Sequence, residues 1–382
     1  MFVDHDHDHV AISAPTEKVA FGFELTSQQE AIRQAVRELA HRELAPVAEA
    51  VRKGLFPGEG LRKLGDMGAL GMVVPYLFGG SAYFAGRGAD TLTFVLSVEE
   101  LARICPAVAL LLVNHTLATL AIVMGGNARL KANCLPELAK GELLATLVDG
   151  GSGASGLEAR RYGEEYLVSG SWAPVLAGGE ADIYVTSVSH GSREGSWLLV
   201  EKGAAGLSWQ REGELAGMGG VAPTKAIYKE CSVPRGNLLG EEGAYGQLAV
   251  PIRGLGALGM AGAALGMAEA AMAEAFHHRK GAGHDLDVQL AVAEMDVALS
   301  AARTLLLGAV FARDKAPLTP PVDCLKAKVF ATQVAAATMA KVYPQGEDDI
   351  HLGAQTAGDL FLSNEEAKRI IGHGLLAHQH AE

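Results

Sequence analysis

The sequence predicts an α+β fold in which helical segments flank a β-rich middle. Before residue 143 and after residue 247, apolar residues recur at the three- and four-residue spacing of buried helix faces. Between them lie short runs rich in β-branched and aromatic residues, separated by turns. We therefore predict a flexible leader (1–21), an N-terminal helical domain (22–143), a β-barrel or sandwich domain (144–246) and a C-terminal four-helix bundle (247–382).

The first helix of the N-terminal part is predicted to begin after Thr26. Thr26 and Gln29 have the spacing of a capping box, and Ile32, Val36 and Leu39 then follow a helical apolar spacing. Further helices are expected over 91–103, 106–123 and about 128–138. The stretch 106–123 is almost wholly apolar, with Asn114 and His115 as exceptions, and predicts a buried core helix rather than a membrane span.

Four strands are predicted in the middle part, at 165–169, 183–188, 197–200 and 225–228. The segment 190–195, which contains two glycines, is expected to turn between the second and third of these strands.

Four helices are predicted in the C-terminal part, near 248–280, 287–314, 322–342 and 363–377. The first of them contains five glycines, which lower its helix propensity. We expect these glycines to allow close helix–helix approach: Gly254, Gly256, Gly259, Gly262 and Gly266.

Composition excludes several classes of protein. The chain has 382 residues, 49% of them hydrophobic, and a net charge of −12, which argues against nucleic acid as a general partner. No apolar run approaches the ~20 residues of a membrane span, and no signal peptide is visible. The four cysteines are scattered and are expected to be reduced thiols of a cytoplasmic protein. The Asp-His repeat at 4–9 reads as a solvated tail rather than a metal site.

Several motifs occur in an order that resembles the acyl-CoA dehydrogenase family. They are the stretch LGDMGALGMVVPYLFGG at 64–80, Gly126 to Glu142, Gly163 to Gly170, Met218 to Gly240, Leu265 to Ala268 and Val292 to Met295. The resemblance implies the three-part fold above, a tetramer, and FAD bound between the β domain and the C-terminal bundle. It also implies an acyl-CoA thioester as substrate, a carboxylate base that removes its α-proton, and an electron-transfer flavoprotein as a possible partner.

The base of that family has no equivalent at either of its two usual positions. Phe361 stands at the usual position near the last helix, and a phenyl ring cannot accept a proton. The second position, in the first helix of the bundle, aligns with Gly254 and Ala257, neither of which ionises. Arg253 lies beside them and is a candidate substrate contact, for a CoA phosphate or a carboxylate, although a solvated arginine is the simpler interpretation.

The cofactor positions implied by the resemblance are also altered. Ser155, in the Gly-rich stretch from Asp149, keeps a hydroxyl, and Trp172 is a candidate ring contact because Pro174 to Ala177 replace the family's flavin-facing residues. Arg279 and Gln289 match parts of the pyrophosphate-binding pattern. The later flavin-contact loop has become Tyr343 to Asp349, whose carboxylates would repel a pyrophosphate.

Three functional hypotheses follow. In the first hypothesis, the chain is a catalytically degenerate subunit that forms a homo- or hetero-tetramer with a competent flavin-containing paralogue. Alternatively it is an atypical FAD-dependent oxidoreductase whose base lies elsewhere, with Asp90, Glu99 and Glu100 as candidates, or it is a binding module for acyl-CoA or an acyl-carrier protein.

Overall fold

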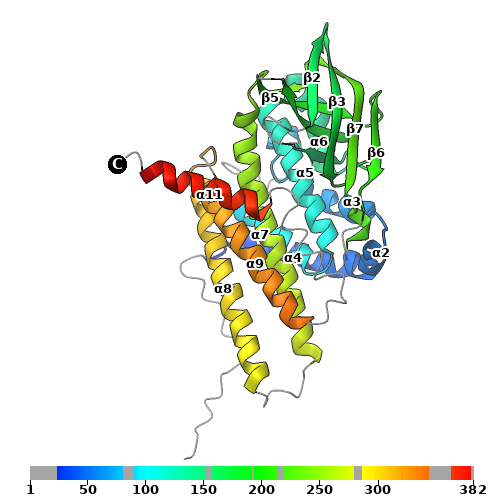
Figure 1. The fold of residues 1–382 in the computed structure, drawn as a ribbon. Coiled ribbons are helices and arrows are strands. Elements are labelled where there is room, and N and C mark those ends of the chain that lie inside the picture. The colour runs from blue at the N-terminus through cyan, green and yellow to red at the C-terminus, as the bar shows by residue number, and fades with distance from the viewer. Residues whose placement is uncertain are drawn as a thin grey trace, which may run out of the picture.

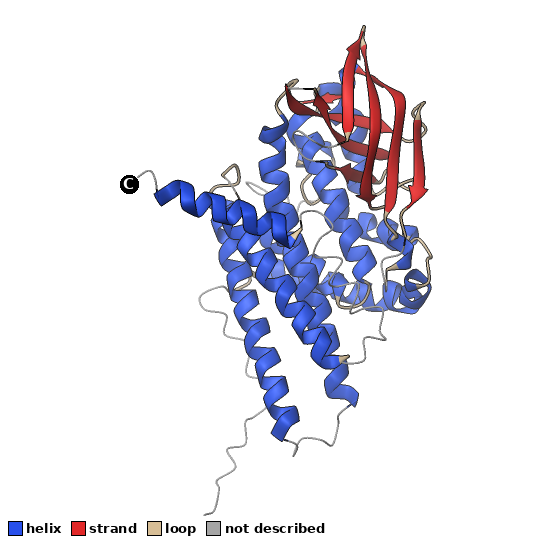
Figure 2. Ribbon diagram, viewed as in Figure 1, coloured by secondary structure: helices blue, strands red, loops and turns tan. Residues whose placement is uncertain are grey.

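The computed structural model describes residues 24–80, 90–150, 156–191, 193–213, 218–278, 286–319, 321–343 and 363–379. The predicted α+β order is confirmed: helices form the N-terminal and C-terminal parts, and the strands gather at one end of the molecule (Figure 1; Figure 2). The predicted leader lies outside the described residues, and the exact domain boundaries stay predictions.

The N-terminal part consists of α1 (Ser27–Leu39), α2 (Ala48–Arg52), α3 (Gly58–Asp66), α4 (Thr91–Ala102), α5 (Pro106–Gly125) and α6 (Ala128–Lys140). The capping box of α1 is confirmed, because the Gln29 amide donates to Thr26 Oγ1 at 3.2 Å and the Thr26 amide donates to Gln29 Oε1 at 3.0 Å. A π-helical turn over Ala40–Leu44 and a 3-10 turn over Ala45–Val47 follow α1, where Pro46 cannot donate a helical hydrogen bond.

The apolar helix α5 lies in the core, as predicted, and its most apolar window is 89% buried. By length and composition α5, α7 (Tyr245–His278) and α8 (Leu286–Lys315) are each long and apolar enough to cross a membrane. The corresponding window of α7 is also 89% buried, whereas that of α8 is only 33% buried. The absence of a membrane span stays a prediction.

His115 is a fully buried histidine on α5. Its Nδ1 accepts a hydrogen bond from the Ala145 amide at 3.2 Å, and its Nε2 has no hydrogen-bond partner within the described ranges. Burial lowers the pKa of His115 to about 4, so the ring is neutral in the folded protein.

Acid is therefore expected to destabilise the protein through His115. Because the folded pKa lies below the unfolded value of about 6.5, the unfolded chain binds more protons between these two values, and stability falls as the pH drops from 6.5 to 4. Urea unfolding across this range measures the effect. His115→Gln keeps an acceptor but cannot be protonated, and it should remove this part of the pH dependence, whereas the exposed control His41→Gln should not.

In the described residues of the middle part there are eight strands: β1 (Ala145–Val148), β2 (Leu157–Tyr162), β3 (Glu165–Val175), β4 (Ile183–His190), β5 (Arg193–Glu201), β6 (Leu207–Arg211), β7 (Thr224–Pro234) and β8 (Leu238–Leu239). They are joined in the order β6-β7-β3-β2-β4-β5-β8, and β1 pairs in parallel with β4. The predicted strands correspond to β3, β4, β5 and β7. His190 pairs with Arg193, so the turn between β4 and β5 is shorter than the predicted segment 190–195.

The C-terminal part contains α7, α8, α9 (Val322–Val342) and α11 (Asn364–Gln379). In Figure 1, α7, α8 and α9 run side by side and α11 lies across their end nearest the strands. α7 packs against α9 and α8 on one side and against α4 and α5 on the other. α7 therefore joins the bundle to the N-terminal part.

The glycines of α7 allow this close approach, as predicted. A Cβ added at Gly256 would lie 3.0 Å from Leu117, and one at Gly259 would lie 2.9 Å from Val113. A Cβ at Gly262 would lie 3.0 Å from the Val95 carbonyl oxygen, and one at Gly266 only 2.3 Å from that of Glu99. The last contact is with backbone, so it leaves no room for any side chain.

Candidate active site

A cavity of about 310 Å³ lies where the three parts of the chain meet. It is bounded by α5, the end of β1, β3, α7, α9 and α11. Its apolar wall consists mainly of Leu117, Leu147, Leu176, Ile252, Met260 and Leu325. The volume is at the lower end of the range for small-molecule sites.

Trp172, the candidate ring contact, and Arg253, the candidate substrate contact, both line this cavity. Trp172 is half-buried on β3, where it pairs with Ala226 of β7. The next residues, Ala173 and Pro174, also line the cavity and are joined by a cis peptide bond. Arg253 reaches the cavity from α7.

Arg253 belongs to a hydrogen-bonded trio with Tyr245 and Asp149. Arg253 Nη2 donates to the Tyr245 hydroxyl at 3.0 Å, and that hydroxyl donates to Asp149 Oδ1 at 2.9 Å. Burial, reinforced by the charge of Asp149, raises the pKa of Tyr245, so the phenol stays protonated and remains a donor. The Tyr245 ring also stacks on Trp197 at 5.1 Å between centroids, which fixes its orientation.

The neutral polar groups of the cavity wall are also hydrogen-bonded within the protein. Asn114 Oδ1 accepts from the Leu147 amide at 3.2 Å, and Asn114 Nδ2 donates to Thr146 Oγ1. The Gly150 amide donates to Ser187 Oγ at 2.9 Å. These bonds tie the end of β1 to α5 and β4.

Lys328 of α9 brings a buried ammonium group to the cavity, with only 1% of the residue exposed. Its Nζ donates to Asn364 Oδ1 at 3.1 Å. Asn364 Nδ2 in turn donates to Thr332 Oγ1 at 3.0 Å, which fixes the orientation of the amide. Lys328 thus connects α9 to the start of α11.

Glu366 and Ser363 line the cavity from α11 and the residue just before it. The Glu366 amide donates to Ser363 Oγ at 3.1 Å. Glu366 is exposed, and within the described part of the chain its carboxylate makes no hydrogen bond or ion pair. The other carboxylate of the described wall, Asp149, is bound by Tyr245.

The structure separates the two residues aligned with the second base position. Ala257 lines the cavity, whereas Gly254 borders a different crevice on α7. Neither can accept a proton. Phe361, at the usual base position, lies outside the described residues.

The predicted pyrophosphate contacts are not brought to this cavity within the described ranges. Gln289 is exposed in the first turn of α8 and does not line it. Arg279, Ser155 and most of the segment 343–349 lie outside the described residues. No group of three potential metal ligands occurs in the described part of the chain; the Asp-His repeat lies outside it.

The three carboxylates considered as weak candidates for a relocated base make structural contacts, which was the role favoured for them. Asp90 caps α4, because its Oδ1 accepts from the Thr93 amide at 3.2 Å, and it also accepts from Gln29 Nε2 at 3.1 Å. Glu99 and Glu100 are 2% and 1% exposed and are paired with arginines. None of the three lines the cavity.

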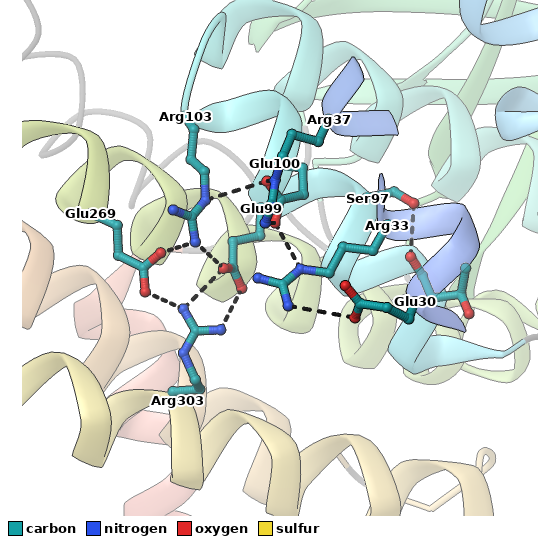
Figure 3. Close-up of polar contacts among 10 residues, drawn as sticks. Glu30, Arg33, Arg37, Ser97, Glu99, Glu100, Arg103, Glu269 and Arg303 are labelled. Atoms are coloured by element: carbon teal, nitrogen blue, oxygen red, sulfur yellow. Dashed lines mark hydrogen bonds and ion pairs between the residues drawn. The ribbon is translucent and has the colours of Figure 1, made fainter. Parts of the chain in front are cut away.

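The buried charge cluster consists of Glu99, Glu100, Glu269, Arg33, Arg37, Arg103 and Arg303 (Figure 3). Arg303 of α8 binds Glu99 with two hydrogen bonds of 2.9 and 3.1 Å. Arg103 and Arg303 both reach Glu269 of α7, and Arg33 and Arg37 of α1 bind Glu100. Four helices are joined by these contacts, so the cluster stabilises the fold rather than acting on a ligand.

A flavin would need donors and acceptors for its polar ring edge. The apolar wall beside Trp172 suits a flat ring, and Asn114, Asp149 and Lys328 of the wall are hydrogen-bonded within the protein. The buried polar atoms without a partner in the described chain belong to Arg103, His115, Thr116, Thr119 and Arg313, none of which lines the cavity. Several of the described polar side chains of the wall are therefore already engaged, and Ser155 and Arg279, where flavin contacts were predicted, lie outside the described residues.

Comparison with known proteins identifies the family. The family model described as acyl-CoA dehydrogenase, N-terminal domain, matches residues 26–142. The short-chain specific acyl-CoA dehydrogenase of Clostridium acetobutylicum is 33% identical over 332 residues, which are 82% of this chain and 86% of that protein. An acryloyl-CoA reductase (NADH) of Anaerotignum propionicum is 31% identical over 76% of this chain and 78% of its own length. The chain belongs to the acyl-CoA dehydrogenase family.

Solved structures agree on the fold. The butyryl-CoA dehydrogenase of Megasphaera elsdenii superimposes with a TM-score of 0.83 at 24% identity, covering 93% of this chain and 99% of that one. A glutaryl-CoA dehydrogenase of Mycobacterium smegmatis, solved with FADH2, gives a TM-score of 0.82 at 18% identity over 92% and 95%. These relatives include flavoproteins, and the chain shares their fold.

Three polar residues of the cavity wall, Asp149, Lys328 and Glu366, were not predicted as site residues, and neither was Tyr245, which binds Asp149. Lys328 follows Leu325 by three residues on an otherwise apolar helical face, and a lone lysine there is a recognisable signal. The position of Asp149, directly after an apolar strand, is a second recognisable signal. Tyr245 and Glu366 have no such signal, because only the tertiary fold brings them to the site.

Proposed function

We propose that the chain is a catalytically degenerate subunit of acyl-CoA metabolism that works with a competent flavin-containing paralogue. The observation that carries this proposal is the cavity itself. Ala257 stands in its wall and Gly254 borders another crevice, whereas Trp172 and Arg253, the candidate cofactor and substrate contacts, both line the cavity. This combination supports a ligand site whose described wall has no ionisable residue at the family's second base position.

The surface of α8 supports an assembly. Five large apolar side chains on it are between 38% and 69% exposed: Leu286, Leu290, Val297, Leu305 and Phe311. At 100° per residue they lie on one broad face along the whole helix. A continuous apolar face of this kind is typical of an interface.

Purification of the tagged chain from its native cells tests the proposal. We expect a second member of the family, with flavin, to co-purify in a fixed ratio. Val297→Asp, which places a charge in the apolar face of α8, should release this partner. Leu55→Asp is the matched control, since Leu55 is 53% exposed away from α8, and it should leave the assembly intact. Isolation of a homo-oligomer that lacks any second member would contradict the proposal.

A second candidate function is favoured by Glu366. As an accessible carboxylate on the cavity wall, it could accept the α-proton of an acyl thioester and so serve as a relocated base. Proton removal alone requires no flavin, and it can be followed as deuterium exchange at the α-carbon of butyryl-CoA by NMR.

Deuterium exchange at the α-carbon of butyryl-CoA distinguishes a relocated base from a degenerate subunit. A relocated base predicts exchange by the wild type, its loss in Glu366→Gln and its retention in Glu365→Gln, the neighbouring carboxylate that pairs with Arg369. A degenerate subunit binds butyryl-CoA without exchange.

A further inference from the structure

A second, smaller crevice of about 40 Å³ lies on α7 between the end of α8 and the start of α9. Gly254, Arg313 and Cys324 are among the residues that line it. A Cβ added at Gly254 would lie 3.7 Å from Arg313 Nε and 3.9 Å from Cys324 Sγ. Any larger side chain at position 254 would fill this space.

Arg313 presents an unsatisfied donor here. Its side chain is only 9% exposed. Nη1 donates to Thr91 Oγ1 at 2.9 Å, but Nε is buried and has no hydrogen-bond partner among the described residues. Burial lowers the pKa of Arg313, although the charge of Asp314 opposes this. A buried unsatisfied donor on a charged group is costly, and it is commonly explained by a water or an ion.

The N-terminus of α9 borders the same crevice. α9 has 21 residues, begins at Val322, and has no side chain that caps it. The Leu325 amide donates to the Pro321 carbonyl, so the three preceding amides have no partner inside the helix. Together with the helix dipole, these amides favour negative charge.

The other titratable groups beside the crevice leave this preference in place. Burial raises the pKa of the Cys324 thiol to about 11, so it is uncharged. Asp323 is 60% exposed and accepts from Lys326 Nζ at 3.0 Å. Asp314 accepts a hydrogen bond from Thr91 and lies 4.0 Å from Arg313 Nη1.

We propose that this crevice binds a small inorganic monoanion, with chloride as the probe, between Arg313 Nε and the N-terminus of α9. The space holds only a few water-sized groups, which is too small for acyl groups and nucleotides. The bound anion connects the ends of α7, α8 and α9. It also accounts for glycine at position 254, since a side chain there would displace the anion.

Thermal unfolding of the full chain in sodium chloride and in sodium gluconate, at equal ionic strength, tests the site. The large gluconate ion cannot enter, so chloride alone should raise Tm, by roughly 2 °C at saturation. Arg313→Met should lose this increment. Arg369→Met, at an exposed arginine of α11, should keep it.

A second pair of variants does not depend on Arg313. Gly254→Ala fills the crevice with a methyl group and Gly254→Asp fills it with a carboxylate, so neither should respond to chloride. Gly254→Asp should have the higher Tm of the two, because its carboxylate replaces the anion. Equal Tm of the wild type in both salts, a chloride response in Arg313→Met, or an Asp variant no more stable than the Ala variant would overturn the proposal.

Discussion

Glu99→Gln is expected to lower the free energy of unfolding by about 3 kcal/mol, because it removes one partner from a buried ion cluster. Glu99 is 2% exposed and binds Arg103 at 2.9 Å and Arg303 at 2.9 Å. Glutamine has nearly the same shape as glutamate but no charge. The two guanidinium groups of Arg103 and Arg303 would then share one carboxylate, that of Glu269. Urea unfolding measures the loss.

The matched control is Glu365→Gln on α11. Glu365 also pairs with an arginine, Arg369, but its side chain is 76% exposed, so its loss should cost less than about 1 kcal/mol. Equal effects of the two substitutions would show that the buried cluster is not what joins the four helices.

Glu100 gives the cluster a pH dependence. Burial alone would raise its pKa, but the hydrogen bonds from Arg37 and Arg33 and the charge of Arg103 lower it to about 2. Because the folded pKa lies below the unfolded value, this stabilisation is present above about pH 4.5 and is lost as the pH falls toward 2. The free energy of unfolding of Glu100→Gln should therefore depend less on pH in this range than that of the wild type, because the variant has no carboxylate to protonate at this position.

Gly266→Ala is expected to destabilise the fold by about 3 kcal/mol, although alanine is the better helix former. The new Cβ would lie 2.3 Å from the Glu99 carbonyl oxygen, so α7 must move away from α4 at the point where the charge cluster joins them. The free energy of unfolding measures this effect.

Gly308→Ala on α8 isolates the helix propensity from the packing. Apart from α8's own backbone, no atom of the described residues lies within 4 Å of a Cβ at Gly308, so in the isolated chain, with no partner on α8, this variant should be more stable than the wild type by about 0.5–1 kcal/mol. A Gly266→Ala variant that is equally stabilised would mean that the two helices are not in contact at this position.

The helices and the main strands were predictable because their signals are local. The Thr26 capping box, the apolar stretch of α5 and the glycines of α7 each act within a few residues or on one helix face. The strands β1, β2, β6 and β8 were missed because they are short or largely polar, and hydrogen bonds to other strands stabilise them rather than local propensity.

The site was less predictable, for a physical reason. Trp172 and Arg253 could be placed from their neighbours in the sequence, whereas Glu366 reaches the cavity, and Tyr245 reaches Asp149 of its wall, only through tertiary packing. Glu99 and Glu100 have one nearby partner, Arg103, but their other partners Arg33, Arg37 and Arg303 are 63 to 204 residues away. Ion pairing over such separations has no local signature.

The visible absorption spectrum of the purified chain alone, before and after incubation with FAD, tests the central claim most directly. That claim is that the fold and cavity of the family persist here without a flavin site. We predict no flavin band from the chain alone, and a flavin band only from its complex with a paralogue. A stoichiometric flavin band from the isolated chain would contradict the account.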